Sequence, residues 1–338
     1  MNLSFTKILM VVAGLSVSLI SSAQQDPHYS NFMHNKLTYN PGFAGNGDKF
    51  CATFLQRTQW VGFGGGDETG VGTGGTTLAR GEAPSNLVGS FNAPISKRIG
   101  LGVHILRDEL GSSLATTPTL SLSYKQPLKN DDVLAIGFSA GLMQKSLDGT
   151  KLKPLEQGDD KIPTSNVSGT TMDFGAGIYY SRQQLSVFDN FYAGISATHL
   201  NQGQVTYEWS GGRRTDDLKM HYYFIAGAEY ALNSDFKLQP NLIVKKDPAK
   251  IQTDLNCFLI WNEKIRGGLT WRPMDAAVVL LGYQYRDNLY VGYSYDLTTS
   301  RILKYSSGSH EIVLRYCFGI KYTPKVNPPV PILTPRFM

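Results

Sequence analysis

Residues 288–297 read NLYVGYSYDL, and residues 309–318 read SHEIVLRYCF. In the first stretch the large apolar side chains of Leu289, Val291 and Tyr293 alternate with Tyr290, Gly292 and Ser294. Successive side chains of a β-strand point to opposite faces, so this alternation predicts a strand with one apolar face and one small or polar face. The second stretch predicts a strand of the same kind.

The same period-two pattern recurs along the chain, whereas helical periodicity is scarce. We predict about fourteen strands from it. They lie at residues 50–60, 86–96, 99–107, 117–127, 133–145, 171–181, 190–200, 220–231, 235–246, 252–261, 264–272, 276–286, 288–297 and 309–318. The composition agrees, since the chain has 35 glycines, 18 tyrosines and 16 phenylalanines but only 17% charged residues. Aromatic residues favour strands, so the sequence predicts an all-β protein.

The connections between the predicted strands are short at one end and long at the other. Short turns occur at Lys97-Arg98, Asn233-Ser234 and Asn262-Glu263, and the long connections are residues 61–85, 146–170 and 201–219. A soluble β-sandwich would show the same alternation within its strands. Short turns opposite long loops are typical of outer-membrane barrels, in which the turns face the periplasm. We therefore predict a closed antiparallel transmembrane β-barrel, with both chain ends in the periplasm.

The start of the chain resembles a secretory signal peptide. Lys7 precedes an apolar run from Ile8 to Ile20, and the small residues Ser21, Ser22 and Ala23 follow. This pattern predicts a signal peptide over residues 1–23. We expect a periplasmic N-terminal segment at 24–49, the barrel at 50–318 and a Pro-rich periplasmic tail at 319–338. The segment at 24–49 and the tail each have the alternative of filling the barrel lumen.

Motifs that suggest chemistry lack the context that the chemistry needs. Residues 70–75 satisfy the bare dinucleotide-binding pattern, but no helix follows them. His28 and His34 are spaced for neither a helical pair nor a standard zinc site. Asp159 and Asp160 fit a solvated loop better than a calcium site. We therefore assign no catalytic residue, no metal site and no cofactor, and we expect a non-enzymatic protein. The net charge of +5 is spread along the chain and indicates no nucleic-acid partner.

Two of the three cysteines should lie together. The first and last strands of a barrel must pair, and Cys51 begins the first strand while Cys317 ends the last. By alternation both side chains should face inward. We expect them to be neighbours across the closing seam, as two packed thiols rather than a disulfide.

Several short motifs follow one another along the chain. They are Gln25–Ser30, Tyr39–Gly45, Gln59–Phe63, Gly100–Val103 with Asp108 and Gly111, His221–Tyr223, Leu238–Pro240, Val291–Asp296 and Ser307–Ile312. In this order they resemble the PorP/SprF family of Bacteroidetes outer-membrane proteins. The residues of these motifs expected to serve structure or partner binding are Asp26, Pro27, Tyr29, Asn40, Pro41, Gly42, Trp60, Gly62, Phe63, Tyr295, Asp296, Ser309, His310 and Glu311. A Gly-rich insertion at Gly64–Ala83 departs from the family pattern and lengthens the first outer loop.

The resemblance implies an outer-membrane component of the type IX secretion and gliding-motility apparatus. Its implied role is to support the export or surface attachment of a cognate adhesin. Expected partners are outer-membrane lipid, the adhesin, and periplasmic or lipoprotein components of the apparatus. Residues 24–49 and the tail are candidate periplasmic contacts, and the long outer loops are candidate contacts for the adhesin. A diffusion channel or hydrophobic-solute transporter is the alternative, because a barrel of this size can enclose a pore.

Overall fold

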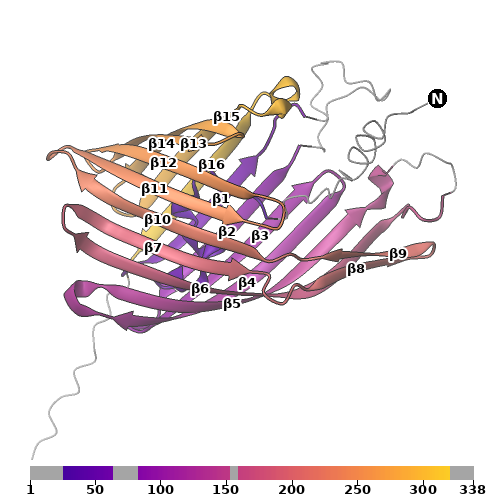
Figure 1. The fold of residues 1–338 in the computed structure, drawn as a ribbon, viewed down its shortest axis with the longest axis horizontal. Helices are drawn as coiled ribbons and strands as arrows, with labels where there is room; N and C mark the ends of the chain where they lie inside the picture. Colours follow the sequence, from indigo (N-terminus) through magenta and orange to yellow (C-terminus); the bar gives the residue numbers. More distant parts are fainter. Residues whose placement is uncertain (1–25, 64–82, 153–158, 320–338) are drawn as a thin grey trace, which may run out of the picture.

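The computed structural model describes residues 26–63, 83–152 and 159–319, and within them fourteen strands form a closed antiparallel barrel (Figure 1). The barrel strands are β1 (Phe50–Thr58), β2 (Ser85–Pro94), β3 (Ile99–Leu110), β4 (Ser113–Pro127), β5 (Val133–Asp148), β6 (Asn166–Leu185), β7 (Phe188–Thr198), β10 (His221–Ala231), β11 (Phe236–Lys246), β12 (Ile251–Trp261), β13 (Ile265–Arg272), β14 (Ala276–Tyr285), β15 (Leu289–Thr298) and β16 (Ser309–Phe318). Each pairs with its neighbours in sequence order, and β1 pairs with β16. The predicted fold class is confirmed.

The connection between β7 and β10 holds a two-stranded hairpin that the sequence analysis did not predict. Its strands are β8 (Gln204–Trp209) and β9 (Gly212–Asp217). The hairpin projects at one end of the barrel (Figure 1). This end, which also carries the connections β1–β2, β5–β6 and β15–β16, is called the long-loop end below. The connection at 146–170 is shorter than expected because β5 and β6 continue into it as paired strands.

The barrel wall is apolar outside and largely polar inside. Along β12, Leu255 and Leu259 are 51% and 42% exposed, whereas Asp254 and Asn256, on either side of Leu255, are buried. In a soluble sandwich the apolar faces would meet in a core, but here they point outward around the barrel. Contact of these leucine side chains with water is unfavourable, whereas their contact with lipid is favourable. The wall is therefore that of an outer-membrane protein.

The described helices are all short. No helix in the described residues is long and apolar enough to cross a membrane.

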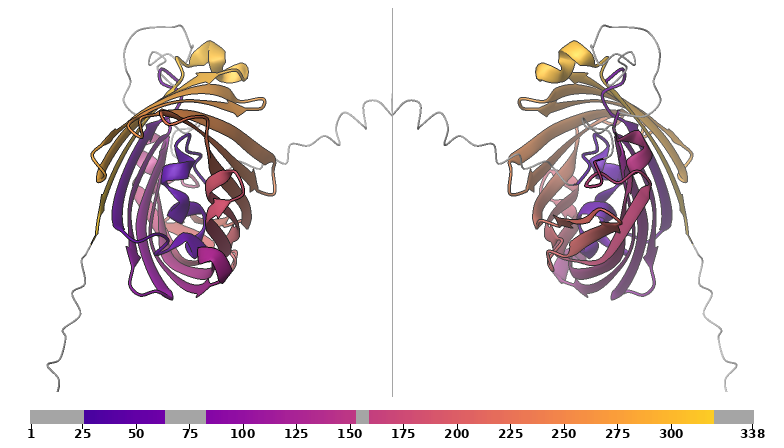
Figure 2. Two further views of the ribbon diagram at one scale, coloured as in Figure 1. Left: turned by 90° about the vertical axis from the view of Figure 1, so that its left-hand side faces the viewer. Right: turned by 90° about the vertical axis from the view of Figure 1, so that its right-hand side faces the viewer.

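The lumen is filled by the chain that precedes β1. This segment, residues 26–45, contains η1 (Phe32–His34), α2 (Lys36–Tyr39) and η2 (Pro41–Phe43). A view along the barrel shows it inside the wall (Figure 2). We call it the lumen segment. The expected periplasmic segment at 24–49 therefore lies within the barrel over these residues, as the alternative foresaw. An even number of strands puts the start of β1 at the periplasmic end of the barrel. It does not determine the path of the chain that precedes β1.

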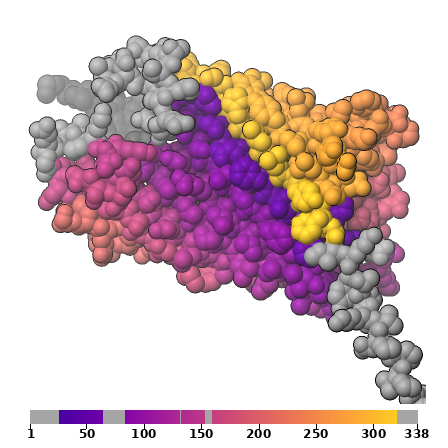
Figure 3. Space-filling view, turned by 180° about the vertical axis from the view of Figure 1, so that it is seen from behind, coloured from indigo at the N-terminus to yellow at the C-terminus, as the bar shows by residue number. Residues whose placement is uncertain are grey.

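The first and last strands meet along the closing seam (Figure 3). Phe50 lies opposite Phe318, and Cys51 lies opposite Cys317. The Cα atoms of the two cysteines are 4.1 Å apart and their side chains form a disulfide. Both side chains are buried. The two residues thus occupy the seam as neighbours, joined by a disulfide where the sequence analysis favoured two packed thiols.

The predicted signal peptide and the Pro-rich tail from residue 320 onward lie outside the described residues. Most of the Gly-rich insertion, with the dinucleotide-like pattern at 70–75, also lies outside them.

Candidate functional site

Five charged side chains meet inside the barrel wall and form what we call the arginine cluster. Its members are Arg57, Asp254, Arg272, Asp296 and Glu311, each less than 3% exposed. Arg57 Nη2 lies 2.8 Å from Asp296 Oδ2, and Arg272 Nη2 lies 2.8 Å from Asp254 Oδ2. Arg57 also contacts Glu311 at 3.3 Å, and Arg272 contacts Asp296 at 3.1 Å. Pairing of this kind is what allows charges to be buried away from water.

The lumen segment docks onto the arginine cluster through its own polar groups. The backbone N–H groups of Ser30 and Asn31 donate to the two carboxylate oxygens of Glu311, at 2.9 and 2.7 Å. The Ser30 hydroxyl donates to Asp296 at 2.9 Å. Three carboxylates face two guanidinium groups here, so the extra negative charge is met by hydrogen bonds from the segment. The cluster is thus complete only when the segment is present.

His28 completes this contact as a neutral group. Its Nε2 lies 2.8 Å from Asp254 Oδ2. Burial, together with the nearby Arg272 guanidinium, lowers the pKa of His28 to about 4. A carboxylate only accepts hydrogen bonds, so the neutral imidazole donates from Nε2. His28 and His34, which were considered as a metal pair, have separate contacts, because the ring of His34 stacks on Tyr290 with centroids 4.2 Å apart.

Farther along the segment, close backbone packing replaces ionic contacts. Asn40 accepts from the Gly42 N–H at 2.8 Å, and its amide donates to the carbonyl oxygens of Ile178 and Ile195 in the wall. Gly137 of β5 faces Pro41 so closely that a Cβ on it would lie 2.3 Å from the Pro41 carbonyl. Such a distance is well inside van der Waals contact, so only glycine fits there.

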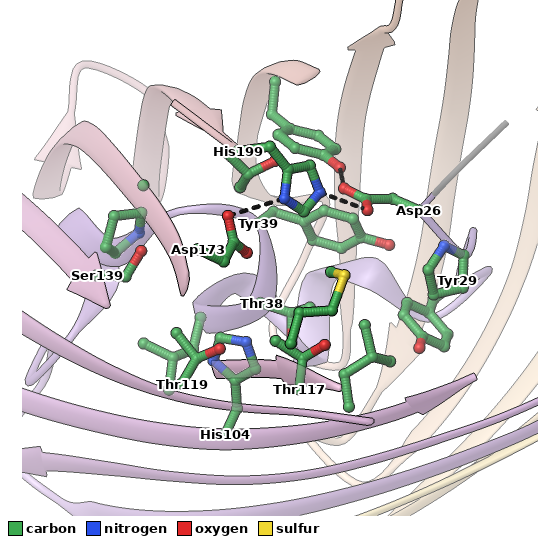
Figure 4. A pocket seen from close by; sticks show the side chains of 18 residues that line it. Asp26, Tyr29, Thr38, Tyr39, His104, Thr117, Thr119, Ser139, Asp173 and His199 are labelled. Atoms are coloured by element: carbon green, nitrogen blue, oxygen red, sulfur yellow. Dashed lines mark hydrogen bonds and ion pairs between the residues drawn. The ribbon is translucent and has the colours of Figure 1, made fainter. Parts of the chain in front are cut away.

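A second polar group, which we call the histidine cluster, lies where the lumen segment reaches the long-loop end. Its members are Asp26, His199 and His221, which each offer a ligand atom within 4.8 Å of the others. His199 directly follows β7 and His221 begins β10. The His199 ring lies between two carboxylates, with Nε2 2.9 Å from Asp26 and Nδ1 2.8 Å from Asp173 (Figure 4).

The charged groups of the histidine cluster shift one another's pKa values. Burial disfavours the charged form of His199, but the carboxylates of Asp26 and Asp173 outweigh it and raise the pKa of His199 to about 10. Burial also opposes ionisation of Asp26, yet His199, His221 and Lys245 hold the pKa of Asp26 well below its usual range. The Tyr223 hydroxyl donates to Asp26 Oδ2 at 2.5 Å and fixes the carboxylate.

A small cavity adjoins the histidine cluster. Its volume is about 50 Å³, and Asp26, His104, Asp173, His199 and Tyr223 are among the residues that line it (Figure 4). A water molecule needs roughly 10–15 Å³ of such space, so the cavity holds a few waters. It is too small to form a passage for a solute of drug size.

The motif residues of the sequence analysis fall into three places. Asp26, Pro27, Tyr29, Asn40, Pro41 and Gly42 lie in the lumen segment, and Asp296 and Glu311 bind it. Trp60, Gly62 and Phe63 lie in the turn after β1, where Trp60 N–H donates to Ser309 Oγ at 3.0 Å. Tyr295 and His310 stand side by side with ring centroids 5.1 Å apart. Motifs from the two ends of the chain therefore meet around one segment.

Arg57, Asp173, His199, Asp254 and Arg272 were not among the residues predicted from the sequence. Alternation predicted a small or polar inner face, and the wall also carries these charges there. A signal was present, since a charged residue on the polar face of a barrel strand faces the lumen. Alternation alone does not tell which lumen charges meet.

Comparison with known proteins identifies a family. The model described as "Type IX secretion system membrane protein PorP/SprF" matches residues 21–316. No curated protein sequence matches the chain.

Solved structures with a similar fold include two toluene transporters. TodX of P. putida has a TM-score of 0.49 and 11% identity, over 86% of this chain and 95% of that one. TbuX of Ralstonia pickettii has a TM-score of 0.48 and 10% identity, over 84% and 93%. The translocator domain of the autotransporter NalP from Neisseria meningitidis has a TM-score of 0.44 and 11% identity, over 93% and 98%. The barrel assignment rests on the strand pairing of this chain itself.

Proposed function

Because the chain belongs to the PorP/SprF family of type IX secretion system membrane proteins, we propose that this barrel supports the export or surface attachment of an adhesin. It does so as a non-enzymatic outer-membrane part of the secretion apparatus. The observation that carries the proposal is the filled lumen. A barrel whose interior is occupied by its own buried segment acts through the surfaces at its two ends and not as a conduit.

The long-loop end is the surface proposed for the adhesin. The hairpin of β8 and β9 is tied to the β5–β6 connection, since the Trp209 indole donates to the Asp160 carbonyl at 2.9 Å. Val205 and Tyr207 of the hairpin pack against Val167 of β6. The hairpin is therefore a fixed projection, and a preorganised surface loses little entropy when it binds a partner.

The short-turn end is the surface proposed for periplasmic and lipoprotein components. Residues 26–45 were also considered for this role, but their burial in the lumen removes them from it. The contacts left to this end are its turns, with the tail beyond residue 319 as a further proposal.

A diffusion channel, the alternative from the sequence, needs a continuous water-filled path. Over the described part of the chain, the lumen segment occupies that path. The charges of the arginine cluster are paired with one another and with the segment, so they do not face a channel.

The test is to replace Gln204–Asp217 by a two-residue turn and to measure the surface proteome. We expect one or a few adhesins to disappear from the cell surface, while the barrel stays folded in the outer membrane. The control replaces Asn233–Asp235 at the short-turn end by an equally short turn, and this change should leave those adhesins in place. Unchanged surface proteins in the hairpin variant would contradict the role proposed for the long-loop end.

A further inference from the structure

The histidine cluster has the geometry of a divalent metal site, and we propose that Asp26, His199 and His221 bind Zn²⁺ at the long-loop end of the lumen. The three side chains come from the lumen segment, from the end of β7 and from the start of β10. A metal ion bound by them would join the segment to the barrel wall. The inference is independent of the role in adhesin export.

The ligand atoms all lie within 4.8 Å of one another, which is near the spacing that a zinc ion requires. Zinc binds imidazole nitrogen and carboxylate oxygen at roughly 2.0–2.2 Å, so two ligand atoms at a tetrahedral angle lie roughly 3.3–3.6 Å apart. Asp26 Oδ2 and His221 Nδ1 are 3.7 Å apart. Asp26 Oδ1 and His199 Nε2 are 2.9 Å apart. If Asp26 Oδ1 and His199 Nε2 moved apart by about half an ångström, the ion would fit between them.

His199 has a carboxylate on its other ring nitrogen, since its Nδ1 lies 2.8 Å from Asp173. A carboxylate hydrogen-bonded to the far nitrogen is the usual partner of a metal-bound histidine, because it fixes the ring and makes it a better ligand. His221 has a carboxylate farther off, with Nε2 4.0 Å from Asp247, which is beyond hydrogen-bond distance.

His221 supplies a second, independent observation. Its side chain is 1% exposed, and neither ring nitrogen has a hydrogen-bond partner among the described residues. A buried polar group without hydrogen bonds costs about 1–3 kcal/mol, so such groups call for a partner. A metal ion on Nδ1 would be that partner. The backbone of His199 is also strained, with a φ of +55° that favours glycine.

The donor set selects the class of metal. Two imidazoles and one carboxylate suit zinc and its transition-metal neighbours, whereas calcium takes 6–8 oxygen ligands. The adjoining cavity leaves room for a water molecule as the fourth ligand. Lys245 donates to the backbone carbonyl of Asp26 and so orients the residue. The ion would replace the proton that now joins His199 and Asp26.

The test is zinc binding by the full-length barrel, purified in detergent with a tag that lacks histidine and stripped with a chelator. We expect calorimetry and metal analysis to find one Zn²⁺ bound per chain, and Co²⁺ to give the visible absorption of a tetrahedral site. The double variant His199→Ala with His221→Ala should lose this binding. Asp173→Asn should weaken it by about 10–100-fold.

His104→Ala is the matched control, because His104 is a buried lumen-facing histidine that lines the same cavity, and it has no carboxylate partner within the part of the chain that the structure describes. It should bind zinc as the wild type does. Folding of every variant is checked by the shift of the folded barrel on unheated gels. Failure of the wild type to bind zinc overturns the proposal, and so does equal binding by a folded double variant.

Discussion

The two clusters that hold the lumen segment differ in how completely their polar groups are paired. In the arginine cluster, Arg57, Asp296 and Glu311 all have ionic partners, and the lumen segment supplies further hydrogen bonds. In the histidine cluster, Asp26 and His199 are hydrogen-bonded, but His221 is as deeply buried and has no hydrogen-bond partner among the residues that the structure describes. The first cluster holds the segment by itself, whereas the buried histidine of the second has capacity for a further ligand.

The largest effect should come from breaking the arginine cluster. Glu311→Leu removes the acceptor of two backbone N–H groups and one partner of Arg57. Loss of one partner from a buried charge pair costs about 3–5 kcal/mol, and we expect a fall of that size in the free energy of unfolding. Urea titration of the barrel in detergent measures it. Glu109→Leu is the control, since Glu109 is exposed and its ion pairs are 3.8 and 3.9 Å long.

A change below about 1 kcal/mol for Glu311→Leu would mean that the segment is not held by this cluster. An equal loss in Glu109→Leu would show that the replacement residue, and not the broken pairing, causes the effect.

The smallest effect should come from replacement by leucine of His221 in the histidine cluster. His221→Leu, made in metal-free protein, removes a side chain that has no hydrogen bond to any residue in the described ranges. Replacing such a group by an apolar one of similar size is nearly neutral, so we expect a change within about 1 kcal/mol. In the presence of zinc the wild type should gain stability by mass action and the variant should not. A large loss in metal-free protein would show that His221 has a partner and would remove the contrast between the clusters.

The wall of the barrel could be predicted from the sequence because its signal is local. The strand predicted at 309–318 coincides with β16, and that predicted at 252–261 differs from β12 by one residue. The alternation of apolar and polar side chains can be seen within each strand, and short turns determine which strands are neighbours. The position of Cys51 opposite Cys317 depends on the same local pattern together with closure of the sheet.

The interior could not be predicted in the same way because its contacts join distant parts of the chain. Ser30 meets Glu311, and Asp26 meets His199, across most of the sequence. No periodicity marks residues 26–45, whose helices are only three or four residues long. The β8–β9 hairpin was missed for a related reason, since its strand Gly212–Asp217 is mostly polar and lacks an apolar face.

The most direct test of a barrel closed by its own N-terminal segment is the conductance of the purified protein in a planar lipid bilayer. Closure predicts no sustained ion current from the wild type at moderate voltage, and current from Glu311→Leu when the segment loosens. Steady conductance of the wild type, at the level of an open porin, would contradict the filled lumen and favour the diffusion channel.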